Sequence, residues 1–187
     1  MAATSSLKNM ALCLTGVCLF CSAILAGVYA VTYEPIADAS RKALVESIGR
    51  VLPEGLDISD AMTEGDIEYY CGKDADGNIA GYAVKTSSIG FGGPLVLMVG
   101  VLPDGTVYNT SVLSHSETPG LGAKCQTDEA FMEQWRGFGP EKVLKVRKDG
   151  GDVDAITAST ITSRAYTAAV AKAVEFVKQK TGGQENE

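Results

Sequence analysis

The longest apolar stretch of the chain lies close to its N-terminus. Residues 10–31 read MALCLTGVCLFCSAILAGVYAV, with no charge and with Thr15 and Ser22 as the polar side chains. At about 1.5 Å per residue this stretch would form a helix of about 33 Å, enough to cross a hydrocarbon core of roughly 30 Å. The pattern predicts a transmembrane helix over 10–31, preceded by a tail over 1–9 and followed by a domain over 32–187.

A cleaved signal peptide is the alternative for the same stretch, since Val28-Tyr29-Ala30 could serve as a cleavage site. The apolar run is longer than the roughly 7–15 residues of an ordinary signal core, and Lys8 is the one charge before it, so we favour a retained anchor. All 23 Asp and Glu residues follow the span. Positive charge on the N-terminal side predicts a single-pass protein of the cell (inner) membrane, with a cytoplasmic N-terminus and an extracytoplasmic domain.

The pattern after the span alternates between helical spacing and strand-like runs. Apolar residues at helical spacing predict a helix over 36–52, ended by Pro53 and Gly55. Four further runs predict strands, over 66–71, 79–86, 95–102 and 106–113. The last two flank Pro103-Asp104-Gly105, which predicts a hairpin turn between them.

The remaining third of the chain mixes loops with helical patterns. A loop over 114–124 leads to a predicted helix over 127–138 with Thr127 as its cap. A short strand is predicted over 143–147, and a last helix over 163–180. These elements together predict an α+β domain with a mostly antiparallel sheet flanked by helices.

Charge and composition narrow the classes of partner. After the span, residues 32–187 carry about −8, which argues against a nucleic-acid partner. Three of the five cysteines lie within the apolar stretch, where cysteine behaves as a small apolar residue. Cys71 and Cys125 could pair only if the fold brings them together. The single histidine excludes a His-rich metal site, and we expect no metal.

The sequence carries none of the common nucleotide-binding, hydrolase or metalloprotease motifs. The segment Ser114-His115-Ser116-Glu117-Thr118 raises the hypothesis of a hydrolase that uses His115. Adjacent residues of an extended chain point apart, however, so these do not form a triad among themselves. The following Thr118-Pro119-Gly120-Leu121-Gly122 is more informative, because its two glycines let the backbone approach a flat ligand closely.

A run of hydroxyl residues precedes the last predicted helix. Residues 154–165 read DAITASTITSRA and include Thr157, Ser159, Thr160 and Thr162. One helix needs one capping residue, for which Thr162 or Ser163 is the candidate, so capping leaves most of these hydroxyls unexplained. A helix start gathers free N–H groups and the positive end of the dipole, which suits a phosphate. An anion site and a doubly capped helix both remain open at this point.

These two segments resemble the FMN-binding domain family. Asp154-x-x-Thr157-Ala158-Ser159-Thr160 is similar to the family's flavinylation motif, Asp-x-x-Ser/Thr-Gly-Ala-Thr, and His115-x-Glu117-Thr118-Pro119-Gly120-Leu121-Gly122 resembles its second hallmark. The order of a membrane helix, strands, this loop and then the threonine motif also matches. The resemblance covers nearly all of the chain.

The resemblance implies a covalent cofactor, FMN, joined through its phosphate to the hydroxyl of Thr160 by a separate flavin transferase outside the cytoplasm. Thr157, Ser159 and Thr162 would then hold the phosphate. Glu117, Thr118, Gly120, Leu121 and Gly122 would line the ring. The chain departs from the motif at Ala158, where glycine is usual, and at Ser159, where alanine is usual. If Ala158 takes a positive φ, its methyl group costs on the order of 1 kcal/mol.

The resemblance also implies a role in a membrane complex. The domain occurs in the G subunit of the Rnf complex, which couples electron transfer between ferredoxin and NAD to ion pumping, and in the C subunit of the Na⁺-translocating NADH:quinone reductase. The length of 187 residues favours the former. The expected function is therefore an electron-carrying subunit, not catalytic alone, among integral-membrane and redox subunits that include a second flavin-bearing one. A membrane-anchored binding module without a redox role is the alternative.

Overall fold

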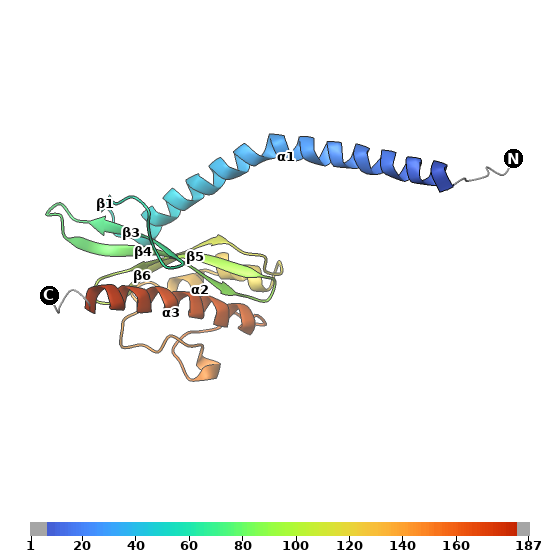
Figure 1. Cartoon of the computed structure of the whole chain (residues 1–187). Helices are drawn as coiled ribbons and strands as arrows, with labels where there is room; N and C mark the ends of the chain where they lie inside the picture. The colour runs from blue at the N-terminus through green and yellow to red at the C-terminus, as the bar shows by residue number, and fades with distance from the viewer. Residues whose placement is uncertain (1–6, 183–187) are drawn as a thin grey trace. The chain divides into compact units, whose positions relative to one another are not determined.

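The computed structural model describes residues 7–182 (Figure 1). These residues divide into two compact units, one up to Ala43 and one from Leu44 onward. The first unit consists of helix. The helix α1 extends over Leu7–Val51 and includes Pro35. It contains the predicted span, and by length and apolar composition it is the one described helix able to cross a membrane.

The prediction that a separate helix begins at residue 36 was wrong, because α1 continues through Pro35. A proline inside a helix removes one backbone hydrogen bond and bends the helix, but it does not have to end it. The predicted apolar face is confirmed within the second unit. Ile48 and Val51 are buried there, and Leu44 packs against the same cluster.

The second unit is built on one antiparallel sheet. Its strands are β1 (Asp57–Ile58), β2 (Met62–Glu64), β3 (Ile67–Lys73), β4 (Ile79–Ile89), β5 (Pro94–Val101) and β6 (Val107–Ser114). The order across the sheet is β1-β3-β4-β5-β6, and β2 pairs with β3. Each predicted strand up to residue 113 is confirmed, as is the hairpin turn at residues 103–105 between β5 and β6.

Each face of the sheet is covered by a helix (Figure 1). On one face lies α3 (Thr160–Gly182), whose apolar side chains join those of β3 to β6 in the main core. On the other face the last turns of α1 pack against Tyr70, Ala83 and Met98. The close approach of α1 requires glycine at position 100, since a Cβ there would lie 1.6 Å from the carbonyl oxygen of Val51. The expected α+β class, with a mostly antiparallel sheet flanked by helices, is confirmed.

An aromatic cluster packs α3 against α2 and the residues that follow α2. The rings of Trp135 and Tyr166 stack with centroids 5.2 Å apart, and Phe131 meets Tyr166 edge-on at 5.1 Å, the arrangements that aromatic pairs favour. The Tyr166 hydroxyl donates to Thr110 Oγ1 of β6 at 2.8 Å. Burial raises the pKa of the Tyr166 phenol. The first half of α3 is therefore fixed to the α2 segment by ring packing and to β6 by a buried hydrogen bond.

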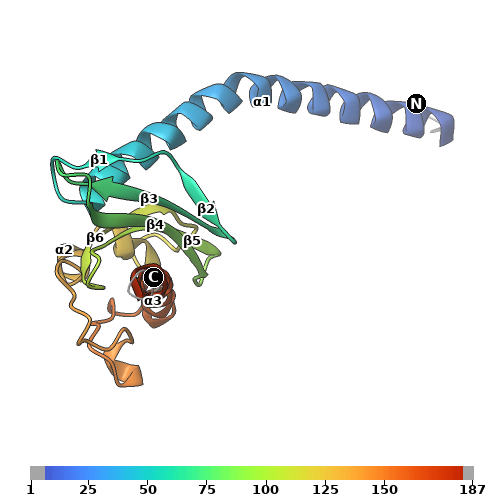
Figure 2. The same ribbon diagram turned by 60° about the vertical axis from the view of Figure 1, so that its left-hand side comes forward.

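The segment between β6 and α3 is less regular than predicted. It contains η1 (Gly122–Gln126), α2 (Glu129–Glu133) and η2 (Arg147–Asp149), and residues 139–153 form a lobe that leaves the sheet (Figure 2). The helix predicted over 127–138 is shorter and is capped by Asp128, whose side chain accepts from the Phe131 N–H. It ends early because Gly137 adopts a φ of 65° and Phe138 then bridges to Val107 of β6.

The strand predicted over 143–147 was wrong. Val146 forms a single parallel bridge with Val153, and the Val143 N–H donates to the Asp152 carboxylate at 2.7 Å. Residues 143–147 therefore pair with residues 152 and 153 of the same lobe and do not join the sheet. The last helix begins three residues earlier than predicted, at Thr160.

Cys71 and Cys125 are both buried free thiols. The sequence left their pairing open. Burial raises the pKa of the Cys125 thiol to about 11 and also raises that of Cys71. Both are therefore protonated near neutral pH and behave as small apolar core residues.

Candidate functional site

The two segments singled out in the sequence meet at a buried carboxyl group. Glu117, in the loop after β6, is 5% exposed. Its Oε2 accepts a hydrogen bond from the Thr162 hydroxyl at 2.6 Å, and its Oε1 accepts from the backbone N–H of Gly92 at 3.3 Å. One side chain thus joins the β4–β5 hairpin tip, the loop after β6 and the first turn of α3.

Glycines surround this carboxyl group closely. A Cβ on Gly90 would lie 2.0 Å from Glu117 Oε1, and one on Gly122 would lie 2.3 Å from Oε2 and 2.7 Å from Thr162 Oγ1. A Cβ on Gly92 would lie 1.9 Å from the Ser116 carbonyl oxygen. These glycines are therefore needed for the close approach of three segments. Three of the four residues from Gly90 to Gly93 are glycine, and this repeated glycine was the signal for the contact that the sequence offered.

The five hydroxyl residues between 157 and 163 differ in accessibility. Thr157 is exposed and Thr160 is partly exposed. Ser159, Thr162 and Ser163 are 6% exposed or less. The hydroxyl of Thr162 is taken by Glu117, and that of Ser163 accepts from the Ile156 N–H and donates to the Ser159 carbonyl, both at 2.9 Å. The hydroxyl residues of this stretch that keep exposed surface are Thr157 and Thr160.

The capping prediction for α3 was wrong. Thr162 and Ser163 both lie inside the first turn, and the first helical bond runs from the Ser163 N–H to the Ser159 carbonyl at 3.0 Å. The N–H groups of residues 160–162 precede that bond and have no carbonyl a turn behind them within the helix. The start of α3 therefore combines the accessible Thr160 hydroxyl with backbone donors that suit an anion.

Ala158 adopts a left-handed backbone, with φ of 62°, and is the one non-glycine residue among residues 7–182 to do so. This is the conformation that the usual glycine of the flavinylation motif would adopt without strain. The alanine side chain is exposed, so its cost is local and conformational. The turn geometry is kept here despite the substitution, at a cost on the order of 1 kcal/mol.

Ala158→Gly is therefore expected to stabilise the protein by roughly 0.5–1 kcal/mol, because relief of the left-handed strain exceeds the added entropy of the unfolded chain. Thermal unfolding of the full-length protein in detergent measures this change. The matched control is Ala168→Gly at an exposed position within α3, which should destabilise by about 1 kcal/mol. A loss of stability in both variants would contradict the strained turn.

Polar contacts hold the approach to α3 in place. The Asp154 N–H donates to Gln134 Oε1 at 2.8 Å, and the Gln134 amide donates back to the Asp154 carbonyl at 3.1 Å. The Arg147 guanidinium pairs with the Asp154 carboxylate. Arg164, one turn into α3, donates two hydrogen bonds of 2.7 Å to the Asp149 carboxylate of the lobe. This contact lowers the pKa of the Asp149 carboxyl. Residues 154–164 are thus held by polar contacts at both ends, through Asp154 and through Arg164.

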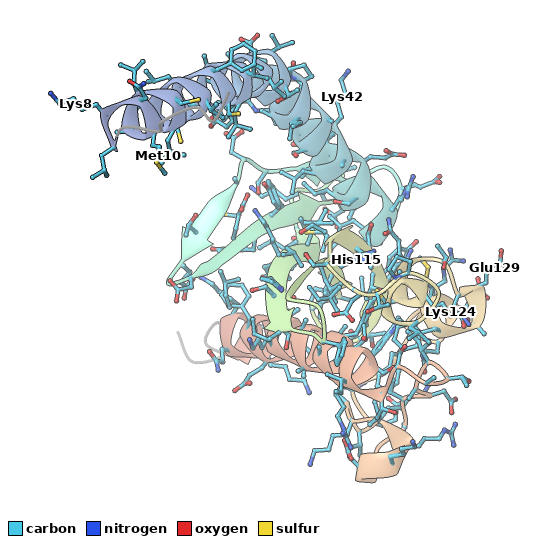
Figure 3. The ribbon with its side chains drawn as sticks, turned by 90° about the vertical axis from the view of Figure 1, so that its right-hand side faces the viewer. Lys8, Met10, Lys42, His115, Lys124 and Glu129 are labelled. Carbon is cyan, nitrogen blue, oxygen red and sulfur yellow. The ribbon has the colours of Figure 1, made fainter. Side chains whose placement is uncertain are left out.

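His115 has a supporting place in the loop. Its Nδ1 accepts from the Glu117 N–H at 3.2 Å, and its Nε2 lies 3.2 Å from Gln126 Oε1. In Figure 3 His115 lies near the segment that carries Lys124, which belongs to η1. Both ring nitrogens already have partners, which disfavours the hydrolase hypothesis.

The other loop residues lie on the accessible side. Thr118 and Gly120 are exposed, and the Thr118 carbonyl accepts from the N–H groups of Leu121 and Ala123. Leu121 is an exposed apolar side chain, while Gly122 is buried against Glu117. Thr118, Gly120 and Leu121 can reach a ligand, whereas Glu117 and Gly122 lie behind them.

A groove of about 620 Å³ is lined by other residues than those of the site, among them Thr86, Ser87, Lys172 and Phe176. Lys172 and Ser87 both line that groove, and Lys172 Nζ donates to the Ser87 carbonyl at 3.0 Å. Among the described residues no cluster of His, Cys, Asp and Glu could hold a metal ion. An accessible hydroxyl beside free N–H groups fits a phosphate-bearing cofactor attached from outside.

Comparison with known proteins gives related chains of similar length. The model of the FMN-binding domain family matches residues 90–175, which span the hairpin tip, the loop and most of α3. The chain is 36% identical over 173 residues to the G subunit of the proton-translocating ferredoxin:NAD(+) oxidoreductase complex of Clostridium ljungdahlii, covering 91% of both chains. It is 36% identical to the G subunit of the ion-translocating oxidoreductase complex of Methanosarcina acetivorans, covering 86% of this chain and 91% of that protein.

Among solved structures, the C subunit of the Na(+)-translocating NADH-quinone reductase of Parabacteroides distasonis matches with 22% identity and a TM-score of 0.49, covering 66% of this chain and 77% of that one.

Proposed function

Because this chain belongs to the family of G subunits of ion-translocating oxidoreductase complexes and carries their FMN-binding domain, we propose that it carries electrons within such a complex. The complex would be a membrane-bound ferredoxin:NAD⁺ oxidoreductase of the Rnf type. The cofactor would be FMN, held covalently by a phosphoester to Thr160.

The accessibility of the Thr160 hydroxyl carries the choice of attachment residue. Ser159, the rival hydroxyl one position earlier, is buried, as are Thr162 and Ser163. Thr157 is accessible but lies three residues before the start of α3, whereas Thr160 opens the helix. A transferase working from solvent can reach Thr160 at the point where backbone donors favour the negative phosphate.

The residues around Thr160 take separate roles in this proposal. The N–H groups of the first turn of α3 and the exposed Thr157 hydroxyl would hold the phosphate. Ser159 and Thr162 would support the turn from behind, because Thr162 already donates its hydroxyl to Glu117. Thr118, Gly120 and Leu121 would face the ring, with Glu117 and Gly122 fixing the position of their loop.

FMN, when bound, supplies one- or two-electron redox chemistry. The part of this chain would be to fix the position of the flavin ring, and the aromatic and glycine contacts around α3 hold the segments beside the proposed attachment residue. A covalent phosphoester suits a domain outside the cytoplasm, because a dissociated flavin would be lost there.

The apolar part of α1 would anchor the chain as a single pass in the cell membrane, with the N-terminus cytoplasmic and the domain outside. Gly16, Ala23 and Gly27 are small and would allow other helices to pack closely. The partners would be the integral-membrane and redox subunits of the complex, including a second flavin-bearing subunit, together with a flavin transferase during maturation.

Flavin retention under denaturing conditions tests this proposal. The full-length protein, produced together with a flavin transferase, should show flavin fluorescence at the position of the chain on a denaturing gel. A covalent phosphoester survives detergent and heat, whereas a flavin held by contacts alone is released. A band of this chain that lacks fluorescence, from cells that contain the active transferase, would overturn the covalent attachment.

A further inference from the structure

The groove of about 620 Å³ is lined by residues of β3, β4 and β5 and by one side of α3. The α3 residues are Lys172, Glu175, Phe176 and Gln179, whose spacing places them on one face of the helix. Lys172 lies about 18 Å along α3 from Thr160. The groove is therefore separate from the attachment site but belongs to the same helix.

Thr86 brings a hydroxyl group without a partner to this groove. Thr86 lines the groove and is 4% exposed, and its Oγ1 is buried with no hydrogen-bond partner among the described residues. Along β4 it shares a face with Tyr82 and Val84, which both belong to the main core. Valine has the same shape and would avoid the cost of an unpaired buried hydroxyl. The threonine thus points to a polar group that enters the groove.

The charged side chains of the groove leave an excess of carboxylate. Glu68 pairs with Lys85 at 2.7 Å, and Lys172 Nζ donates to a backbone carbonyl at 3.0 Å. Asp66 and Glu175 are both exposed, and neither forms an ion pair within residues 7–182. A cationic group in the groove would therefore find carboxylates that no cation of this chain has already paired.

Apolar side chains form the remaining lining of the groove. Ile67 and Val96 are partly buried and Phe176 is 7% exposed. Lysine and arginine place their aliphatic stems along apolar surface of this kind and keep the charged head in a polar environment. Carboxylates beside apolar walls therefore fit a long basic side chain better than a fully apolar or an anionic one.

We propose that the groove binds a chain segment of another subunit of the same complex, which inserts a lysine or arginine side chain. The charged head would face Asp66 and Glu175, the stem would lie along Phe176, and the Thr86 hydroxyl would accept a hydrogen bond from the inserted segment. This inference rests on the proposed function, in which the chain works among other subunits. Charge complementarity fixes the orientation of a docked partner. Because α3 begins at Thr160, docking on its later turns would also position the flavin relative to that subunit.

Co-purification of the complex tests the proposal. The tagged, full-length chain is produced in cells that make the other subunits, and it is purified in a mild detergent. The parent is compared with Glu175→Lys, Thr86→Val and Asp76→Lys, and quantitative mass spectrometry measures the other subunits recovered per chain. Asp76 is the matched control, because it is an exposed acid between β3 and β4, outside the groove, and undergoes the same change of charge.

Glu175→Lys should lower the recovery of the other subunits at least about tenfold, because like charges would face each other across the contact. Thr86→Val should lower recovery about threefold, while the isolated chain unfolds at an unchanged or higher temperature. Asp76→Lys should leave recovery unchanged. Full recovery in both groove variants overturns the proposal, and so does an equal loss in Asp76→Lys. A lower unfolding temperature of Thr86→Val would also refute it, since the hydroxyl would then have a partner within the chain.

A photo-crosslinking residue identifies the occupant of the groove. With p-benzoylphenylalanine in place of Gln179, which lines the groove, illumination should join the chain to one subunit of the complex at a segment that contains lysine or arginine. The absence of such an adduct, or an adduct at a segment without a basic residue, contradicts the proposal. If the parent itself recovers no other subunit, the proposed place in a complex fails, and the proposed occupant fails with it. If the parent and both groove variants recover the subunits equally, the groove proposal alone fails.

Discussion

Thr160→Ala is expected to abolish covalent flavin on this chain. The hydroxyl of Thr160 is the proposed attachment point, it is accessible, and it opens α3 beside the free N–H groups of the first turn. Alanine removes the nucleophilic oxygen and little else, so the fold should survive. In-gel flavin fluorescence of the full-length protein, produced with a transferase, should fall to background while the protein band keeps its intensity.

Thr157→Ala and Ser159→Ala are the matched controls, since each removes one hydroxyl from the same stretch. Ser159 is buried and Thr157 precedes the turn formed by Ala158, so neither should serve as the acceptor. Ser159→Ala should keep most of the fluorescence, and Thr157→Ala should keep a reduced but clear signal because its hydroxyl is proposed only to help hold the phosphate. Retention in Thr160→Ala with loss in Ser159→Ala would show that the serine unusual for this motif has taken over the role, and would refute the assignment.

The sheet could be predicted from the sequence because its signals are local. The strands before residue 114 alternate or are continuously apolar, and Pro103-Asp104-Gly105 specifies a hairpin turn. The lobe over 139–153 could not be predicted in the same way. Val143 and Val146 look like strand residues, but a side-chain contact from Asp152 to the Val143 N–H folds the segment on itself.

The site could be predicted in part. The hydroxyl run and the glycine-rich loop identified both segments, and the expected strain at Ala158 is confirmed by its φ of 62°. The third segment, the hairpin tip, was missed because its contact with Glu117 joins residues 25 positions apart through a backbone N–H. The Thr162 hydroxyl donates to Glu117, which is distant in sequence. The sequence pattern alone therefore could not distinguish the role of this hydroxyl from that of Thr160.

Glu117→Ala is expected to cost roughly 3 kcal/mol of folding stability. The change would leave the buried Thr162 hydroxyl and the Gly92 N–H without their partner, and each unpaired buried group costs about 1–3 kcal/mol. It would also open a space beside Gly90 and Gly122, both of which closely face this carboxyl group. Because the carboxyl group fixes the first turn of α3, covalent flavin should fall as well, through misplacement of Thr160.

The conservative variants separate this positioning role from simple loss of fold. Glu117→Gln keeps the volume and an oxygen that can accept from Thr162, so it should lose roughly 1 kcal/mol and keep most of its flavin. Thr162→Val removes the other half of the 2.6 Å contact. If Glu117 and Thr162 act as a pair, the double variant Glu117→Ala, Thr162→Val should lose less folding stability than the sum of the two single losses. The difference should be at least about 0.5 kcal/mol. Thermal unfolding would contradict this role if the stability losses of the single variants simply added in the double variant and flavin loading was unaffected in Glu117→Ala. The carboxyl group would then fill space without positioning Thr160.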